Sequence, residues 1–217
     1  MPHAVKQTTS PAGYHLGVAL SVLAVTTPVS YSHRYAGDLY GNLFTLLVGR
    51  SGEDQKSTAL SIGLRVLREA NPDRIGRMPG SPEGLIDALA DRPQQILRYS
   101  EFGSFLSRAQ RKGSYFEPMK ALFTDLWDCT PQSRVKANGA GTNVPNPRLS
   151  IMAACSTPYL EKYTEPEDWS GGFMGRWAVM YARRERTDPD PSGDPSAIPA
   201  LAQGLQQRLG LAQGGLC

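Results

Sequence analysis

A polar loop at residues 49–55 leads into Lys56, Ser57 and Thr58. Its small residues are Gly49, Ser51 and Gly52. Glycines let backbone N–H groups turn inward around phosphate oxygens, and the N-terminus of a following helix adds partial positive charge. A lysine supplies a point charge for the β- and γ-phosphates, and the hydroxyl after it can ligate Mg²⁺. These residue types in this order predict a phosphate-binding loop.

The spacing of this loop differs from the standard one, which has a glycine six residues before the lysine and another directly before it. Here Gly49 is seven residues before Lys56, and Gln55 stands directly before the lysine. We expect Gln55 to take part in the loop with its neighbours. The alternative is an ordinary strand-to-helix turn with a surface lysine, since such turns favour glycine, serine and aspartate.

An acidic residue follows a second strand-like run. Residues 96–99 end in Ser100 and Glu101. In P-loop ATPases, an acidic side chain at the carboxyl end of a neighbouring strand lies near Mg²⁺ or the attacking water. Such a carboxylate binds the metal or acts as general base. Only one acid is present here instead of a pair, and the alternative for Glu101 is a helix cap.

Two more polar positions are candidates for phosphate contact. Residues 149–155 form an apolar run that predicts a buried strand, and it ends in Ser156 and Thr157. A polar side chain there could sense the γ-phosphate, and a strand cap is the alternative. Arg176 stands before the apolar run 177–182. It could reach a phosphate as an arginine finger, in cis or across a subunit boundary.

These residues need a scaffold of strands alternating with helices. Strands are predicted at 43–48, 96–99, 149–155 and 177–182, and helices at 15–25, 57–70, 83–90, 102–110, 116–127 and 159–163. This alternation predicts a three-layer α/β fold with a mainly parallel central sheet. Residues 37–42 are predicted as a turn. The long polar stretch 128–148 is either a hairpin that touches DNA or a plain surface excursion.

Length and composition limit the number of domains and the class of protein. A chain of 217 residues, with 40% apolar and 20% charged residues, suits one sizeable soluble domain with or without tails. We expect a flexible tail at 1–14, one ATPase domain at 15–186, and a proline-rich linker with a C-terminal helix or tail at 187–217. The net charge of +3 permits nucleic-acid contact without arguing for it.

Cysteine spacing and hydropathy argue against several classes of protein. The three cysteines have no paired spacing, so neither a disulfide framework nor a zinc site is expected. No apolar run reaches the ~18 residues of a membrane span. The first residues lack the pattern of a signal peptide, and a cytoplasmic protein is therefore expected.

Taken in order, the motifs resemble a family of phage- and plasmid-borne replication proteins that carry a helicase-like P-loop ATPase domain, often beside a primase. The motifs are VGRSGEDQKSTAL at 48–60, SPEGLIDAL at 81–89, SEFGSFL at 100–106, NPRLSIMAACSTPYL at 146–160 and GGFMGRW at 171–177. In that family the loop commonly has this longer spacing, with a basic residue before the lysine. Gln55 departs from that pattern.

The resemblance implies a RecA-like core that binds ATP and Mg²⁺. Lys56 and Ser57 would hold phosphate and metal, Glu101 would serve the Walker B role and contact the metal, and Arg176 would be the finger. Ser156 or Thr157 would be the sensor.

The expected function is ATP hydrolysis coupled to single-stranded or duplex DNA, in a homo-oligomer with a possible primase partner. The alternatives are an ATP-binding switch or assembly protein without motor activity, and a degenerate P-loop domain that does not hydrolyse ATP.

Overall fold

The computed structural model describes residues 8–27, 30–33, 37–135, 139, 141–183 and 196–214. Residues 1–7 of the predicted N-terminal tail and most of the predicted linker lie outside these residues. The described part is built on a sheet of four parallel strands in the order β4-β7-β3-β8. The strands are β3 (Phe44–Gly49), β4 (Gln94–Tyr99), β7 (Arg148–Ser156) and β8 (Trp177–Tyr181). The prediction of a mainly parallel central sheet is confirmed.

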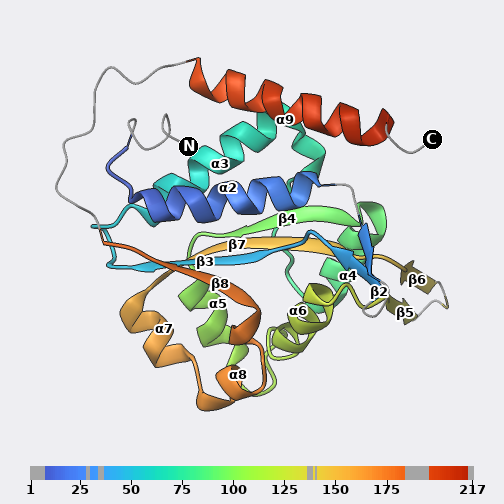
Figure 1. The fold of residues 1–217 in the computed structure, drawn as a ribbon. Helices are drawn as coiled ribbons and strands as arrows, with labels where there is room; N and C mark the ends of the chain where they lie inside the picture. Colours follow the sequence, from blue (N-terminus) through green and yellow to red (C-terminus); the bar gives the residue numbers. More distant parts are fainter. Residues whose placement is uncertain are drawn as a thin grey trace.

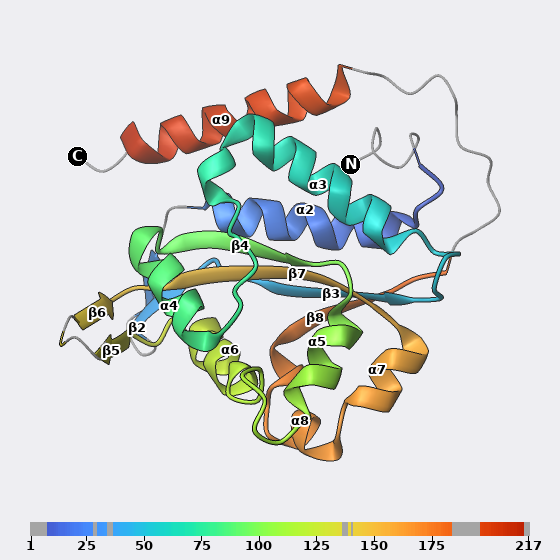
Figure 2. The same ribbon diagram turned by 180° about the vertical axis from the view of Figure 1, so that it is seen from behind.

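Helices cover both faces of this sheet (Figures 1 and 2). On one face lie α2 (Ala12–Thr26) and α3 (Lys56–Ala70), and α9 (Ala197–Gly214) packs over them from outside. The other face carries α4 (Pro82–Asp91), α5 (Phe102–Ala109), α6 (Met119–Trp127), α7 (Thr157–Tyr163) and the short α8 (Pro166–Ser170). Two 3₁₀ turns, η1 (Pro72–Arg74) and η2 (Met174–Arg176), join these elements.

The strand β3 shows why the sheet needs helices on both sides. All six of its residues are buried. Leu47 packs into the cluster formed with α2 and α3, whereas Phe44, Leu46 and Val48 pack into the cluster on the opposite face. Successive side chains of a strand point to opposite faces, so an uninterrupted apolar strand has to be covered twice.

Two segments differ from their predictions. Residues 37–40 form the strand β2 (Gly37–Tyr40) instead of a turn, because β1 (Ser30–His33) supplies an antiparallel partner that local composition does not reveal. The helix predicted from residue 116 begins only at Met119. Pro118 explains this, since the residue before a proline is disfavoured in the helical conformation.

The polar stretch 128–148 contains a hairpin of β5 (Gln132–Val135) and β6 (Gly141–Val144). Asp87 on α4 anchors this hairpin, because it accepts hydrogen bonds from Arg134 at 2.9 Å and Thr142 at 3.0 Å. Residues 136–138 and 140 of this stretch lie outside the described residues. Contact of the hairpin with DNA remains a prediction.

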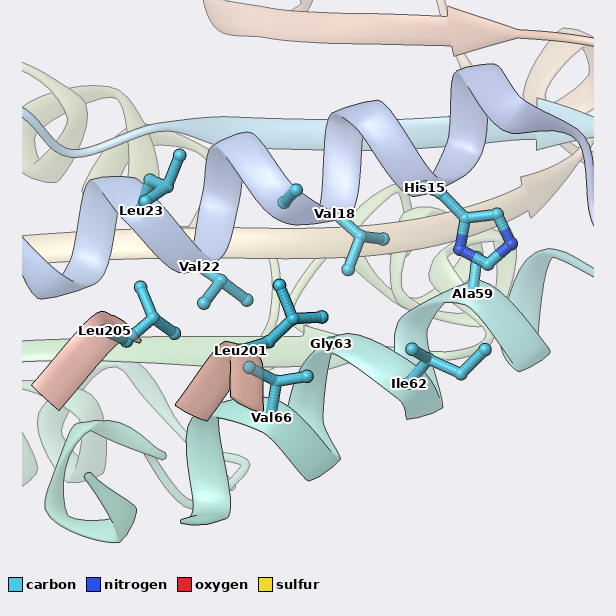
Figure 3. Close-up of a pocket in the computed structure, with 11 residues that line it drawn as sticks. His15, Val18, Val22, Leu23, Ala59, Ile62, Gly63, Val66, Leu201 and Leu205 are labelled. Carbon is cyan, nitrogen blue, oxygen red and sulfur yellow. The ribbon is translucent and has the colours of Figure 1, made fainter. Parts of the chain in front are cut away.

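An apolar cavity of about 250 Å³ lies between α2, α3 and α9 (Figure 3). Its lining side chains are almost all aliphatic, and Val18, Val66 and Leu205 represent the three helices. Gly63 lets α2 and α3 approach closely, since a Cβ there would lie 2.2 Å from Val18. His15 stands at one end, bonded to Thr8 at 3.0 Å, and burial lowers its pKa. In the described residues no helix has the length and apolar character needed to cross a membrane.

Candidate functional site

A second, polar cavity of about 540 Å³ lies at the carboxyl edge of the sheet. Its lining residues come from the segments that follow three strands, namely Ser51, Gly52, Gln55, Lys56, Ser57 and Thr58 after β3, Ser100 and Glu101 after β4, and Ala154, Cys155, Ser156 and Tyr159 around the end of β7. Eight residues that the sequence predicts for one site thus line one cavity. The other four lining residues, which were not predicted, are Ser100, Ala154, Cys155 and Tyr159.

The sheet topology explains why the cavity forms there. The chain leaves β3 into α3 on one face, and it leaves the neighbouring β7 into α7 on the other face (Figures 1 and 2). Two adjacent parallel strands whose outgoing connections separate to opposite faces leave a crevice outside their carboxyl ends. The phosphate-type loop and Ser156 therefore face one another across this crevice.

The loop takes two left-handed backbone conformations. Gly52 has φ +74°, which glycine adopts without a steric penalty. Gln55 has φ 47° and ψ 40° and stands at the N-cap of α3, without a side-chain cap bond. This is the position where the standard motif has its second glycine. The chain thus keeps the backbone conformation typical of glycine there while carrying a different side chain.

Lys56 reaches back over the loop from the first turn of α3. Its ammonium donates to the carbonyl oxygens of Gly49 at 3.0 Å and Arg50 at 2.7 Å. Burial lowers the pKa of Lys56, while the nearby Asp54 and Glu101 carboxylates oppose that shift. The first backbone N–H groups of any helix have no acceptor within it, so those at Lys56 and Ser57 are available to an anion in the cavity.

An internal ion pair closes the loop. The buried Asp54 carboxylate accepts a hydrogen bond from the backbone N–H of Arg50 at 2.6 Å, and it pairs with the Arg50 guanidinium at 3.2 Å. Arg50 also pairs with the exposed Glu53 at 2.5 Å. This ion pair lies within the loop between β3 and α3, and the sequence motif did not predict it.

Tyr14 supports the loop from below. Its buried hydroxyl shares its proton between the carbonyl oxygens of Val48 at 2.7 Å and Ala182 at 2.8 Å, which ties the ends of β3 and β8 together. Burial raises the pKa of Tyr14 to about 12. A Cβ at Gly49 would lie 2.2 Å from the Tyr14 hydroxyl, so Gly49 is needed here for close approach. Gly49 therefore shapes the loop without lining the cavity.

Glu101 and Ser156 face the cavity from the other two strands. Each occupies the N-cap position of a helix, α5 and α7 respectively, yet neither side chain makes a capping hydrogen bond. Both line the cavity, which agrees better with the functional alternative than with a cap. Thr157, the first residue of α7, does not line it.

Arg176 lies at the opposite edge of the sheet. It precedes Trp177, which pairs with Phe44 at the start of β3, whereas the loop follows the end of that strand. Its guanidinium binds Asp128 at 2.7 Å and the Gly172 carbonyl at 2.9 Å. The structure therefore does not bring Arg176 to the loop of its own chain. The finger in cis is corrected to a structural brace, because β8 runs parallel to β3.

The chain matches no protein-family model, and a search of the curated proteins found no match. Among the described residues, no three His, Cys, Asp or Glu side chains converge as a metal-binding group. The polar cavity and the motif resemblance are therefore the features of this chain that indicate a function.

Proposed function

We propose that this chain is a RecA-like P-loop ATPase that binds Mg²⁺-ATP in the polar cavity. The observation that carries the proposal is the meeting of the Lys56 loop with Glu101 and Ser156 around one cavity. The residues that the motif resemblance assigns to phosphate, water and sensing are separated by up to 100 positions in the sequence, from Lys56 to Ser156, yet they line one crevice.

The residues that line the polar cavity fit a nucleoside triphosphate. A cavity of about 540 Å³ falls within the ordinary range for small-molecule sites. Lys56 and the N–H groups at the start of α3 would hold the phosphates, together with the hydroxyls of the loop. Ser57 and Glu101 would hold Mg²⁺, which proteins usually bind through one or two carboxylates and the substrate phosphates.

The chain's own groups suit hydrolysis of the γ-phosphate. The Lys56 ammonium offsets the charge that develops on the phosphoryl oxygens, and Mg²⁺ adds to that effect when bound. The Glu101 carboxylate orients a water and accepts its proton. Ser156, across the crevice, donates a hydrogen bond to the transferred group.

The wider role follows from the motif resemblance. We propose a helicase-like motor domain in phage or plasmid DNA replication that acts on DNA as a homo-oligomer in the cytoplasm, with a possible primase partner. Arg176 as a finger acting across a subunit boundary stays a prediction.

The test is isothermal calorimetry with Mg²⁺-ATP on the wild type and on Lys56→Ala. We expect Lys56→Ala to weaken binding by at least about tenfold, because a charge-assisted contact to phosphate is lost. Arg65→Ala is the matched control, since Arg65 is an exposed cation on α3 away from the cavity. Absence of binding in the wild type, or an equal loss in the control, contradicts the proposal.

Turnover separates a motor from the alternative, an ATP-binding switch. The switch is favoured by one observation, that Glu101 is the single carboxylate that the described residues contribute to the lining of the cavity. For a motor, Glu101→Gln loses about 100-fold or more in turnover at saturating Mg²⁺-ATP, as removal of a general base does. Tight binding with no turnover in the wild type, with or without single-stranded DNA, supports the switch instead.

A further inference from the structure

A third cavity, of about 530 Å³, lies directly beside the candidate nucleotide site. The two cavities share Ser100 and Glu101, at the turn that follows β4. The additional lining that matters here consists of Arg98, Tyr99, Arg108 and Phe116. The lining of this third cavity differs from that of the candidate nucleotide site, because it combines aromatic rings with two guanidinium groups.

The two guanidinium groups share this cavity with one carboxylate of the described residues, that of Glu101. Arg98 donates from Nε to the Ser100 hydroxyl at 2.8 Å, and Arg108 lies over the Phe116 ring, 5.5 Å from its centroid. Neither forms an ion pair with a carboxylate of the described residues. Four other arginines in that part of the chain do, namely Arg50, Arg92, Arg134 and Arg176. The cavity therefore offers two cations to an anionic ligand.

The aromatic side chains offer a stacking surface and a polar group. The half-buried Phe116 ring packs edge-on against Phe105, with centroids 6.1 Å apart and planes at 80°. Tyr99 is 5% exposed, and its buried hydroxyl has no hydrogen-bond partner among the described residues. A buried hydroxyl without a partner is costly, so its place in the wall of this cavity points to a ligand acceptor.

Basic and aromatic side chains continue along the chain beside this cavity. Arg111, Lys112 and Tyr115, all exposed, stand between the lining residues Arg108 and Phe116. Arg77, also exposed, precedes the lining residue Met78. Cations combined with aromatic rings are the composition of surfaces that bind a single strand, with phosphates on the cations and bases on the rings.

We propose that this third cavity binds single-stranded nucleic acid. A phosphodiester group contacts Arg98 and Arg108, and a base stacks on Phe116. The proposal identifies where the proposed ATPase would contact its nucleic acid. Only the link between strand binding and ATP hydrolysis rests on the proposed function. Since Ser100 and Glu101 line both cavities, a bound strand lies next to the turn that carries the hydrolytic carboxylate.

The test is fluorescence anisotropy with labelled oligo(dT) and oligo(rU) of equal length, over a series of salt concentrations and without nucleotide. Each phosphate contact contributes about 0.7 to the slope of log affinity against log salt. We expect Arg98→Ala/Arg108→Ala to reduce that slope by about 1.4 and Arg65→Ala/Arg68→Ala, which removes the same charge from α3, to leave it unchanged. The tighter-binding probe identifies the natural strand as DNA or RNA.

Stacking is tested separately. Phe116→Ala weakens binding by about tenfold or more, whereas Phe116→Tyr retains it. If the double variant does not fold, Arg108→Ala alone is measured in the same way, because Arg108 is an exposed side chain. This single variant is expected to reduce the slope of log affinity against log salt by about 0.7. No binding by the wild type at low salt, or equal losses in both double variants, overturns the proposal. Calorimetry on Lys56→Ala is independent of this result, so either proposal can fail alone.

Discussion

Gln55 shows how one residue departs from a motif while the backbone follows it. Its φ of 47° lies in the left-handed region, which costs an ordinary residue roughly 1–2 kcal/mol. The fold accepts this cost immediately before Lys56, at the start of α3. The shape of the loop is therefore imposed by its surroundings, since the side chain makes no cap bond that would favour it.

We expect Gln55→Gly to be neutral or stabilising by up to about 1 kcal/mol, because relief of the left-handed strain outweighs the added chain entropy. Gln55→Val is expected to destabilise by more than 1 kcal/mol or so, since β-branched residues are poorly accommodated at positive φ. Urea unfolding of both variants measures this difference. A more stable valine variant than glycine variant would contradict the left-handed conformation.

At the scale of elements, the important contact joins α2 to the ends of two strands. The Tyr14 hydroxyl binds carbonyl oxygens of β3 and of the residue that follows β8. The loop of the candidate site begins one residue after Val48. The N-terminal helix thus supports the site from beneath, although it contributes no residue to the polar cavity.

Tyr14→Phe removes that hydroxyl while leaving the ring in place. We expect a loss of about 1–3 kcal/mol in the free energy of unfolding, because a buried carbonyl group and a partly buried one lose a donor. Tyr115→Phe is the matched control, since Tyr115 is 78% exposed, and it should change stability by less than about 0.5 kcal/mol. Equal effects of the two substitutions in chemical denaturation would show that the hydroxyl does not brace the strands.

For the molecule as a whole, two buried thiols give folding a dependence on alkaline pH. Burial raises the pKa of Cys129 and of Cys155 to about 11, from an ordinary value near 9. Between these values the unfolded chain loses protons that the folded protein keeps. The free energy of unfolding is therefore unaffected by the thiols below pH 9 or so and falls as the pH rises toward 11.

We expect Cys129→Ala/Cys155→Ala to be less sensitive to this pH range than the wild type, by about 2 kcal/mol per thiol at the upper end. Urea unfolding at pH 8 and at pH 10.5 measures the difference, and each protein serves as its own reference at pH 8. Parallel loss in both proteins would assign the alkaline effect to other groups.

Local patterns in the sequence predicted much of the fold. The apolar runs of β3 and β7, the loop before Lys56 and the acidic residue after β4 depend on the chemistry of neighbouring residues, so composition and spacing reveal them. The same patterns predicted a parallel sheet covered by helices. They misplaced β2 and the start of α6, where a partner strand and a proline decided the outcome.

The tertiary structure decided which of these pieces meet. The order β4-β7-β3-β8 brings Glu101 and Ser156 to the loop and sends Arg176 to the far edge. It also places Tyr14 beneath Val48 and brings Arg98 and Phe116 to the lining of one cavity. Contacts between distant segments depend on how the chain crosses from strand to strand, and local residue preferences do not contain that information.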